Sequence, residues 1–303
     1  MGHVGKNSMR GREMGRYAVI VVHGIGGGTG KERREFSSSL KSNVKKLLPL
    51  NVDILWDEAN WEKLNDAVDS VIERVVKDVS SRYIKEVEKS IKNQECSDRA
   101  NSQTASKKRF SWLFSLFQEA ALYFLRVKLG SLKLVEKFLP SIIDAAIDLP
   151  LYMQKPKGDE IRNVVREAIA NASTCAEKVI LVGHSLGSVI AFDIAAEELK
   201  KNPSCRLSAL VTMGSPLKWV TEIREAESNG QEDVPRIESI PWVNFWDPAD
   251  PVPERKGLDD KIFRGVINRE VKSGKELIGA HCSYWTNMEI AQTIAKMISG
   301  ESI

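Results

Sequence analysis

Residues 178–188 read KVILVGHSLGS, and this stretch restricts the fold more than any other part of the chain. Its run VILV is apolar and mostly β-branched, as expected of a central parallel strand that is covered on both faces. Gly183 ends the run, and from Leu186 onward apolar residues recur at helical spacing until Lys200. The stretch therefore predicts a strand, a sharp turn and a helix in direct succession.

The turn carries the pattern Gly-x-Ser-x-Gly, with Ser185 at its centre. Because Gly183 and Gly187 lack side chains, strand and helix can approach closely enough to hold Ser185 in a strained turn at the carboxyl edge of the sheet. A serine there is positioned as a nucleophile. The backbone N–H of Leu186, at the positive end of the helix, then points toward any anion that forms beside it. The alternative is a tight strand-to-helix turn that contains a serine by chance.

A second apolar run, Tyr17 to Val22, leads into the glycine-rich sequence HGIGGGTGK at residues 23–31. This sequence fits neither phosphate-binding glycine pattern. The P-loop spacing places Ile25 where a glycine is needed and Glu32 where a hydroxyl is needed, and the dinucleotide spacing fails from both starting glycines. We interpret the loop as one that turns the backbone N–H of Ile25 into the site as a second oxyanion donor. The alternative is a flexible loop that leads into a helix.

Further strands are predicted at residues 52–56, 207–213 and 242–246, and helical patterns alternate with them. This alternation favours an α/β fold with a mostly parallel central sheet and helices on both faces. On this basis we divide the chain into a disordered N-terminal arm, an α/β core in two segments, and a helical cap or lid inserted between the segments (residues 1–16, 17–59 with 153–303, and 60–152).

The predicted cap is basic and rich in apolar residues. Between Arg74 and Lys137 there are 14 Lys and Arg residues against 7 Asp and Glu residues. Polar residues such as Gln118 and Glu119 interrupt its apolar faces, so no segment has the roughly 18 uninterrupted apolar residues of a membrane span. One interpretation is a cap that shields an apolar acyl pocket and makes peripheral contact with a membrane. The alternative is a helical layer that packs on the sheet and has a solvated basic exterior.

The composition of the whole chain excludes several classes of protein. The 42% apolar and 28% charged content is ordinary for a globular protein, and the four cysteines form no Cys-x-x-Cys pair. The cysteine spacing therefore indicates neither a disulfide framework nor a zinc site. The polar segment at residues 1–16 lacks the apolar core of a secretory signal, so we expect a cytoplasmic protein. The basic residues match no nucleic-acid recognition motif, so no nucleic-acid partner is expected.

A serine hydroxyl needs a base to accept its proton, and histidine is the usual base at neutral pH. The chain has four histidines. His3 lies in the predicted arm, His23 in the glycine-rich loop and His184 inside the turn itself. His281 is left as the candidate base, on a short segment that follows the last predicted strand. A lone histidine is more often structural, but this site would otherwise lack a base.

The imidazole of the base needs a carboxylate that fixes its tautomer and stabilises its protonated form. The predicted strand at residues 242–246 runs directly into the sequence DPADPVP at residues 247–253. The prolines limit the directions in which Asp247 and Asp250 can point. Asp247 ends the strand and Asp250 lies further along the loop. Either aspartate can be the partner of the histidine on these grounds, and the other would cap the turn or support the site.

Five parts of the sequence together resemble the serine esterase and lipase branch of the α/β-hydrolases (HGIG at 23–26, GHSLG at 183–187, TMGSP at 212–216, DPVP at 250–253, and His281). They occur in the order Ser, Asp, His that is typical of that family. The resemblance implies an α/β-hydrolase fold in which Ser185 is the nucleophile, His281 the general base and Asp250 the acid that orients it. The Asp-x-Val-Pro pattern of lipase-like members favours Asp250 over Asp247. The N–H groups of Ile25 and Leu186 would form the oxyanion hole.

The activity implied by this resemblance is hydrolysis of a small-molecule or lipid acyl ester through an acyl-enzyme, with no metal or organic cofactor. The fold cannot separate this activity from that of a thioesterase, phospholipase or amidase with the same triad. A further alternative is a non-catalytic hydrolase-like module that binds a membrane or a partner through residues 110–153. The intact serine, histidine and acid argue against that alternative.

Overall fold

The computed structural model describes residues 17–24, 30–61, 149, 152–153, 156–202, 205–228, 233–253, 257–275 and 278–303. These residues make up the α/β core. The predicted arm, nearly all of the predicted cap and the predicted oxyanion donor Ile25 lie outside them.

In the described part of the chain, six parallel strands form one sheet in the order β2-β1-β3-β4-β5-β6. Their bounds are β1 Tyr17–Val22, β2 Ile54–Glu58, β3 Lys178–His184, β4 Leu207–Met213, β5 Trp242–Trp246 and β6 Val266–Glu270. The sheet confirms the predicted α/β class. Strand β6 is an additional edge strand that the sequence pattern did not indicate, because its residues Asn268, Arg269 and Glu270 are polar.

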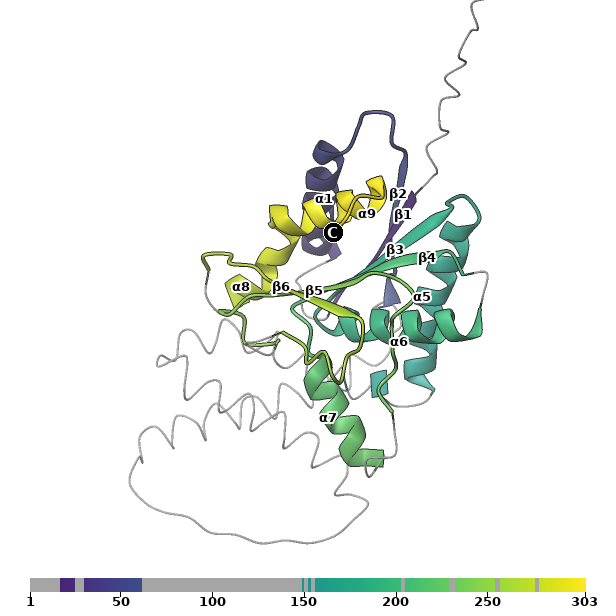
Figure 1. Cartoon of the computed structure of the whole chain (residues 1–303), viewed down its shortest axis with the longest axis vertical. Helices are drawn as coiled ribbons and strands as arrows, with labels where there is room; N and C mark the ends of the chain where they lie inside the picture. The colour runs from purple at the N-terminus through teal and green to yellow at the C-terminus, as the bar shows by residue number, and fades with distance from the viewer. Residues whose placement is uncertain are drawn as a thin grey trace, which may run out of the picture.

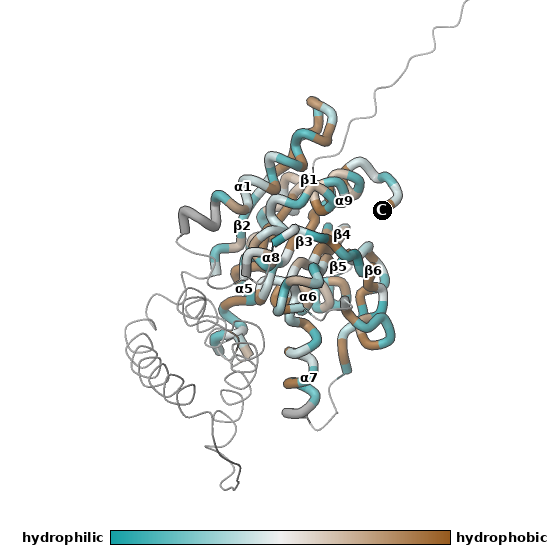
Figure 2. The backbone as a smooth tube through the Cα atoms, turned by 90° about the vertical axis from the view of Figure 1, so that its left-hand side faces the viewer, coloured by the Kyte–Doolittle hydropathy of each residue, from teal (hydrophilic) through white to brown (hydrophobic). Residues whose placement is uncertain are grey.

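Helices cover both faces of the sheet (Figure 1). Their bounds are α1 Gly30–Leu47, α5 Lys157–Ser173, α6 Leu186–Lys201, α7 Leu217–Ser228, α8 Ile278–Ser283, the 3₁₀ helix η2 Tyr284–Thr286, and α9 Met288–Ser299. Helices α1 and α9 pack on one side of the strands, and α5 and α6 pack on the other, as the view in Figure 2 also shows.

The alternation of side chains along each strand explains why the sheet is covered twice. In β1, Ala18, Ile20 and Val22 join the core beneath α5 and α6, whereas Val19 and Val21 join the core beneath α1 and α9. All five side chains are fully buried. Burial of each larger aliphatic side chain stabilises the fold by about 1.5–3 kcal/mol. A strand that is apolar on both faces is therefore stable only at the centre of the sheet.

The strand order also indicates where a site can form. From β1 the chain crosses to β2 on one side, and the next strand of the core, β3, pairs with β1 on its other side. The carboxyl ends of β1 and β3 thus diverge at a switch point, which is where open α/β sheets leave a crevice for ligands. Ser185 follows directly at the end of β3, and Gly24 lies two residues beyond the end of β1.

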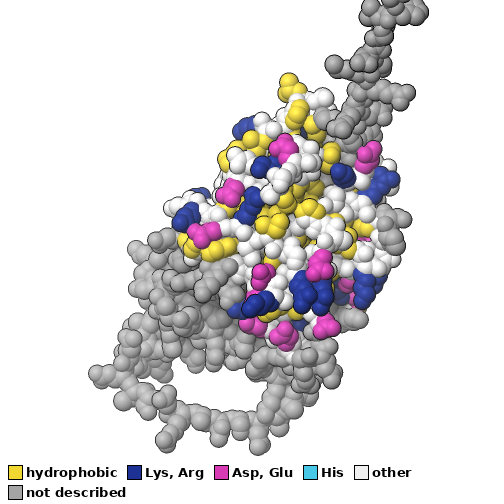
Figure 3. All heavy atoms as spheres, viewed as in Figure 1, with side chains coloured by type: hydrophobic (Ala, Val, Ile, Leu, Met, Phe, Trp, Pro, Cys, Tyr) yellow, Lys and Arg dark blue, Asp and Glu magenta, His cyan; other side chains and the backbone are white. Residues whose placement is uncertain are grey.

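The described surface carries charges of both signs. Lys and Arg side chains are interspersed with Asp and Glu side chains on the face drawn in Figure 3. Among the described residues, no helix is long and apolar enough to cross a membrane.

Candidate active site

The strand-turn-helix unit around Ser185 has the strained geometry that the sequence predicts. Ser185 has φ 55° and ψ −130°, and it is the one non-glycine residue with positive φ in the described part of the chain. Such a conformation costs about 1–3 kcal/mol and persists only where its surroundings impose it. Here the Ser185 N–H donates to the carbonyl of Met213 at 3.0 Å, which ties the turn to the end of β4.

The two glycines of the motif are required by packing. A Cβ on Gly183 would lie 2.5 Å from the carbonyl oxygen of Gly187, and a Cβ on Gly187 would lie 2.1 Å from the carbonyl oxygen of Val22. Helix α6 therefore begins in direct backbone contact with β1 and β3. This contact places the first turn of α6, including the N–H of Leu186, beside Ser185.

Two hydroxyl groups hold the turn from behind. The Ser188 hydroxyl donates to the Ser185 carbonyl, and a 2.7 Å hydrogen bond joins the hydroxyls of Ser188 and Ser215. The N–H of Leu217 donates to the Ser215 oxygen at 3.3 Å. Ser215 belongs to the Gly-Ser-Pro segment after β4, and the sequence pattern alone assigned no function to its side chain. Its position explains why a serine follows the glycine there.

The backbone of Gly24 lies against the proposed nucleophile. A Cβ at Gly24 would be 2.4 Å from Cβ and 3.0 Å from Oγ of Ser185. The carbonyl of the preceding His23 accepts a 3.1 Å hydrogen bond from the indole N–H of Trp61. The His23 ring is buried, and its Nε2 lies 3.6 Å from a carboxylate oxygen of Glu58 with no hydrogen-bond partner among the described residues. His23 is thus held at the end of β1.

The histidine and one aspartate of the predicted triad form a hydrogen-bonded pair. His281 Nδ1 lies 2.8 Å from Asp250 Oδ2, and the Asp250 side chain is fully buried. Asp250 Oδ1 accepts a 2.9 Å hydrogen bond from the N–H of Val252. A carboxylate only accepts, so Nδ1 of the imidazole carries the proton. Its Nε2 is then left to accept a proton from another group.

The other aspartate of the loop has a structural place. The Asp247 carboxylate accepts hydrogen bonds from the N–H groups of Ala249 at 2.9 Å and Ser273 at 2.8 Å. Its backbone carbonyl accepts from the N–H of Asp250 at 2.9 Å. Asp247 therefore caps the turn that carries Asp250, and the structure brings Asp250, not Asp247, to His281.

Tyr284 is a site residue that the sequence reasoning missed. Its hydroxyl donates to Asp250 Oδ2 at 2.8 Å and accepts from the N–H of Asp247 at 2.9 Å. Burial, and then the negative charge of Asp250, raise the pKa of Tyr284 far above its ordinary value, so the hydroxyl stays protonated. The sequence feature that could have indicated Tyr284 is its position three residues after His281, since residues at this spacing lie on the same side of a helix. A buried tyrosine hydroxyl also needs a polar partner.

The end of β4 lies next to both the Ser185 turn and the His281–Asp250 pair. Met213, its last residue, accepts the hydrogen bond from Ser185, and Gly214 follows with φ 55°. A Cβ on Gly214 would lie 3.0 Å from His281 Cε1, 3.0 Å from Asp250 Oδ2 and 2.9 Å from Tyr284 Cε2. Met213 therefore contacts the Ser185 turn, and the adjacent Gly214 lies beside the His281–Asp250 pair.

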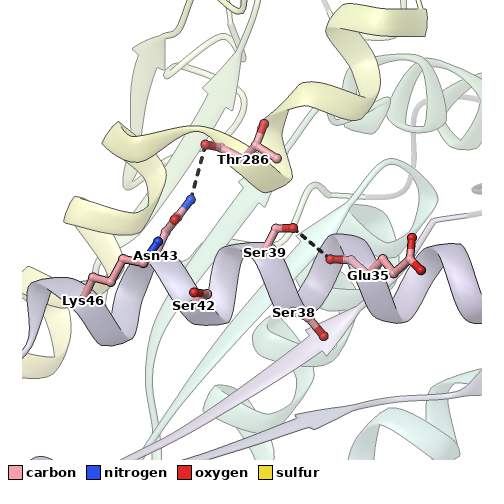
Figure 4. Close-up of a pocket in the computed structure, with 7 residues that line it drawn as sticks. All are labelled: Glu35, Ser38, Ser39, Ser42, Asn43, Lys46 and Thr286. Carbon is pink, nitrogen blue, oxygen red and sulfur yellow. Dashed lines mark hydrogen bonds between the residues drawn. The ribbon is translucent and has the colours of Figure 1, made fainter.

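Two hollows on the described surface lie away from Ser185. One of about 640 Å³ lies between α1 and η2 and is lined by polar side chains that Figure 4 shows (Glu35, Ser38, Ser39, Ser42, Asn43, Lys46 and Thr286). Another of about 420 Å³ lies between α5, α6 and α7. Neither is lined by Ser185, Asp250 or His281. Within the described ranges, no three or more His, Cys, Asp or Glu side chains are grouped as a metal site.

No protein-family model matches the sequence, and no curated protein matches it. Among solved structures, the chain is similar to a proposed cell surface hydrolase of Lactobacillus plantarum, with 10% identity, a TM-score of 0.40, and coverage of 96% of this chain and 94% of that one. It is also similar to a lipase-esterase related protein of Clostridium acetobutylicum, with 10% identity, a TM-score of 0.35 and coverage of 94% of both chains. Similarity this weak tells nothing about a substrate.

The class of protein is evident from the molecule itself. A six-stranded parallel sheet, covered on both faces and carrying a strained serine turn at its switch point, is an α/β-hydrolase-like fold. The sequence resemblance to that fold is confirmed. The activity depends on the chemistry of the site.

Proposed function

We propose that this protein is a carboxylic ester hydrolase that works through a triad of Ser185, His281 and Asp250. The observation that carries the proposal is the 2.8 Å hydrogen bond between Asp250 and His281, which lies beside Gly214, the residue after the strand end that holds the Ser185 turn. Neither the strained backbone of Ser185 nor the binding of an imidazole to a buried carboxylate is needed to stabilise the fold. The combination is what nucleophilic acyl transfer requires.

In the proposed reaction, Ser185 Oγ attacks the ester carbonyl carbon while His281 Nε2 accepts the hydroxyl proton. The charge that develops on the carbonyl oxygen is stabilised by the N–H of Leu186 at the start of α6 and, as the sequence predicts, by the N–H of Ile25. The alcohol then leaves with the proton from His281. Water, activated by the same imidazole, attacks the acyl-enzyme and releases the carboxylic acid and free Ser185.

Asp250 orients His281 in this cycle. Its carboxylate receives hydrogen bonds from His281, Tyr284 and the N–H of Val252. The donors from Tyr284 and Val252 hold the carboxylate in place. The carboxylate keeps the imidazole in the tautomer that presents Nε2 for proton transfer and stabilises the imidazolium when it forms.

Hydrolysis of a thioester or amide, or of a phospholipid acyl ester, would use the same groups, so these remain the alternative substrates. The predicted cap would decide among them by the shape of its acyl pocket. The cap, its peripheral membrane contact and the cytoplasmic location remain predictions from the sequence.

The test is hydrolysis of p-nitrophenyl esters with acyl chains from two to sixteen carbons, with Ser185→Ala as the blank. Ser39→Ala, which removes an α1 hydroxyl that donates only to the helix backbone in the described structure, is the matched control. We expect turnover that Ser185→Ala abolishes and Ser39→Ala retains. Absence of both turnover and fluorophosphonate labelling of Ser185 in the wild-type protein would refute the proposal.

A further inference from the structure

His184, the residue before Ser185, makes a contact that the proposed reaction does not use. It is the last residue of β3, and only 8% of it is exposed. Its Nε2 lies 2.8 Å from the backbone carbonyl oxygen of His281. Since a carbonyl oxygen only accepts, His184 Nε2 must carry the proton. The strand end that bears the nucleophile thus donates a hydrogen bond to the main chain of the base.

The His184 ring also packs against the segment that carries the base. Its centroid lies 4.6 Å from that of His281, 5.2 Å from that of Trp285 and 5.9 Å from that of Tyr284. These three residues belong to α8 and η2, which follow one another without a break. The imidazole of His184 therefore fills the space between the nucleophile turn and the base segment.

The base segment needs such an anchor. Helix α8 has six residues, and a helix this short is not stable by itself in water. Asp250 fixes the ring of His281 through Nδ1, and the Tyr284 hydroxyl ties the same segment to Asp250 and Asp247, but these side-chain contacts do not fix the backbone of His281 itself. The hydrogen bond from His184 fixes the backbone of the same residue, 97 positions away in sequence.

We propose that His184 is a positioning residue for the general base, because its Nε2–H anchors the carbonyl of His281 and so sets the distance between the base and Ser185. The proposal rests on the proposed function, in which His281 takes the proton of Ser185. Displacement of a catalytic group by about 1 Å can lower the rate by about 100-fold. An anchor on the strand that carries the nucleophile keeps this displacement small.

The charge state of His184 agrees with this role. Burial, and then the proximity of His281, lower the pKa of His184, so its imidazole is neutral near pH 7. A neutral ring donates one hydrogen bond and places no positive charge next to His281 at the moment when His281 becomes an imidazolium. A permanently charged side chain at this position would oppose the reaction.

The first experiment compares His184→Gln, whose side-chain amide can reach the same carbonyl, with His184→Phe, which keeps a ring and loses the donor. We expect kcat of His184→Phe to fall by about 10- to 100-fold with little change in KM, and kcat of His184→Gln to stay within about fivefold of wild type. Full activity of His184→Phe, or equal losses in both variants, would overturn the proposal. Near-ultraviolet circular dichroism checks that each variant is folded.

The second experiment does not depend on turnover. Nitrogen-15 histidine NMR of the Ser185→Ala protein, which has only the four native histidines, reports the protonated nitrogen of each ring. We expect His184 to be neutral with the proton on Nε2, and the Nδ1–H signal of His281 to move in His184→Phe but much less in His184→Gln. A proton on Nδ1 of His184, or an unmoved His281 signal in His184→Phe, refutes the anchor. Absence of both ester turnover and fluorophosphonate labelling, with the NMR results as expected, refutes the proposed function and leaves the anchor standing.

Discussion

Substitution of Gly214 by alanine tests the arrangement of the site with a single methyl group. Gly214 has φ 55°, and an added Cβ would lie between 2.9 and 3.0 Å from three atoms, Asp250 Oδ2, His281 Cε1 and Tyr284 Cε2. These distances are shorter than the optimal separation of non-bonded heavy atoms, about 3.5–4.0 Å. None of the three atoms ends a flexible chain. The neighbours must therefore move, and with them the acid–base pair.

The expected cost has two parts. A non-glycine residue in the left-handed region costs about 1–2 kcal/mol. Overpacking a filled site costs about 1–3 kcal/mol more. Gly300→Ala isolates the first part, because Gly300 has φ 71° at the end of α9 and an added Cβ meets nothing within 4 Å among the described residues. We expect Gly214→Ala to lose about 2–5 kcal/mol of unfolding free energy and Gly300→Ala about 1–2 kcal/mol.

Equilibrium urea unfolding measures the two stabilities, and ester hydrolysis measures the catalytic consequence. Because the methyl group displaces the His281–Asp250 pair, we expect kcat/KM of Gly214→Ala to fall by about 100-fold or more, while Gly300→Ala keeps wild-type activity. Equal destabilisation of the two variants, with Gly214→Ala still fully active, would refute this expectation. That outcome would mean that the backbone after β4 does not determine where the pair lies.

Other substitutions separate the contributions of the residues around the pair. Tyr284→Phe leaves the buried N–H of Asp247 without its acceptor and should cost about 1–3 kcal/mol in urea unfolding, with a smaller loss of activity. Asp250→Asn should lower kcat by about 10³- to 10⁴-fold, whereas Asp247→Asn should mainly lower stability; the reverse order would reassign the acid. The pH dependence of stability tests the buried state of His184. Its folded pKa is below the unfolded value of 6.5, so the unfolded chain binds a proton first and stability should decrease as pH falls below 6.5, by up to about 1.4 kcal/mol per pH unit. His184→Gln should flatten that slope between pH 6.5 and 5, and an unchanged slope would show that His184 does not titrate on unfolding.

The local pattern of the sequence predicted most of the core. The apolar run before Gly183, the two glycines around Ser185 and the helical spacing after Leu186 specify their structure within about twenty residues, because strand, turn and helix preferences are local. Helix α9 is likewise set by local signals, because the Asn287 side chain caps it by accepting from the N–H groups of Glu289 and Ile290. Strand β6 escaped prediction because an edge strand needs only one apolar face, and its polar residues resemble a loop.

The sequence alone named Ser185 and His281 as candidates, since a glycine-flanked serine and a shortage of histidines are visible without a structure. It left Asp250 and Asp247 open on residue grounds, and it did not find Tyr284 or the contact of His184 with His281. These features depend on residues that are far apart in the sequence and meet at the edge of the sheet. Asp250 is 31 residues from His281, and His184 is 97 residues from it. The direction of a side chain in a proline-rich loop is decided by the hydrogen-bond donors that surround it after folding. Only the tertiary structure brings those donors together.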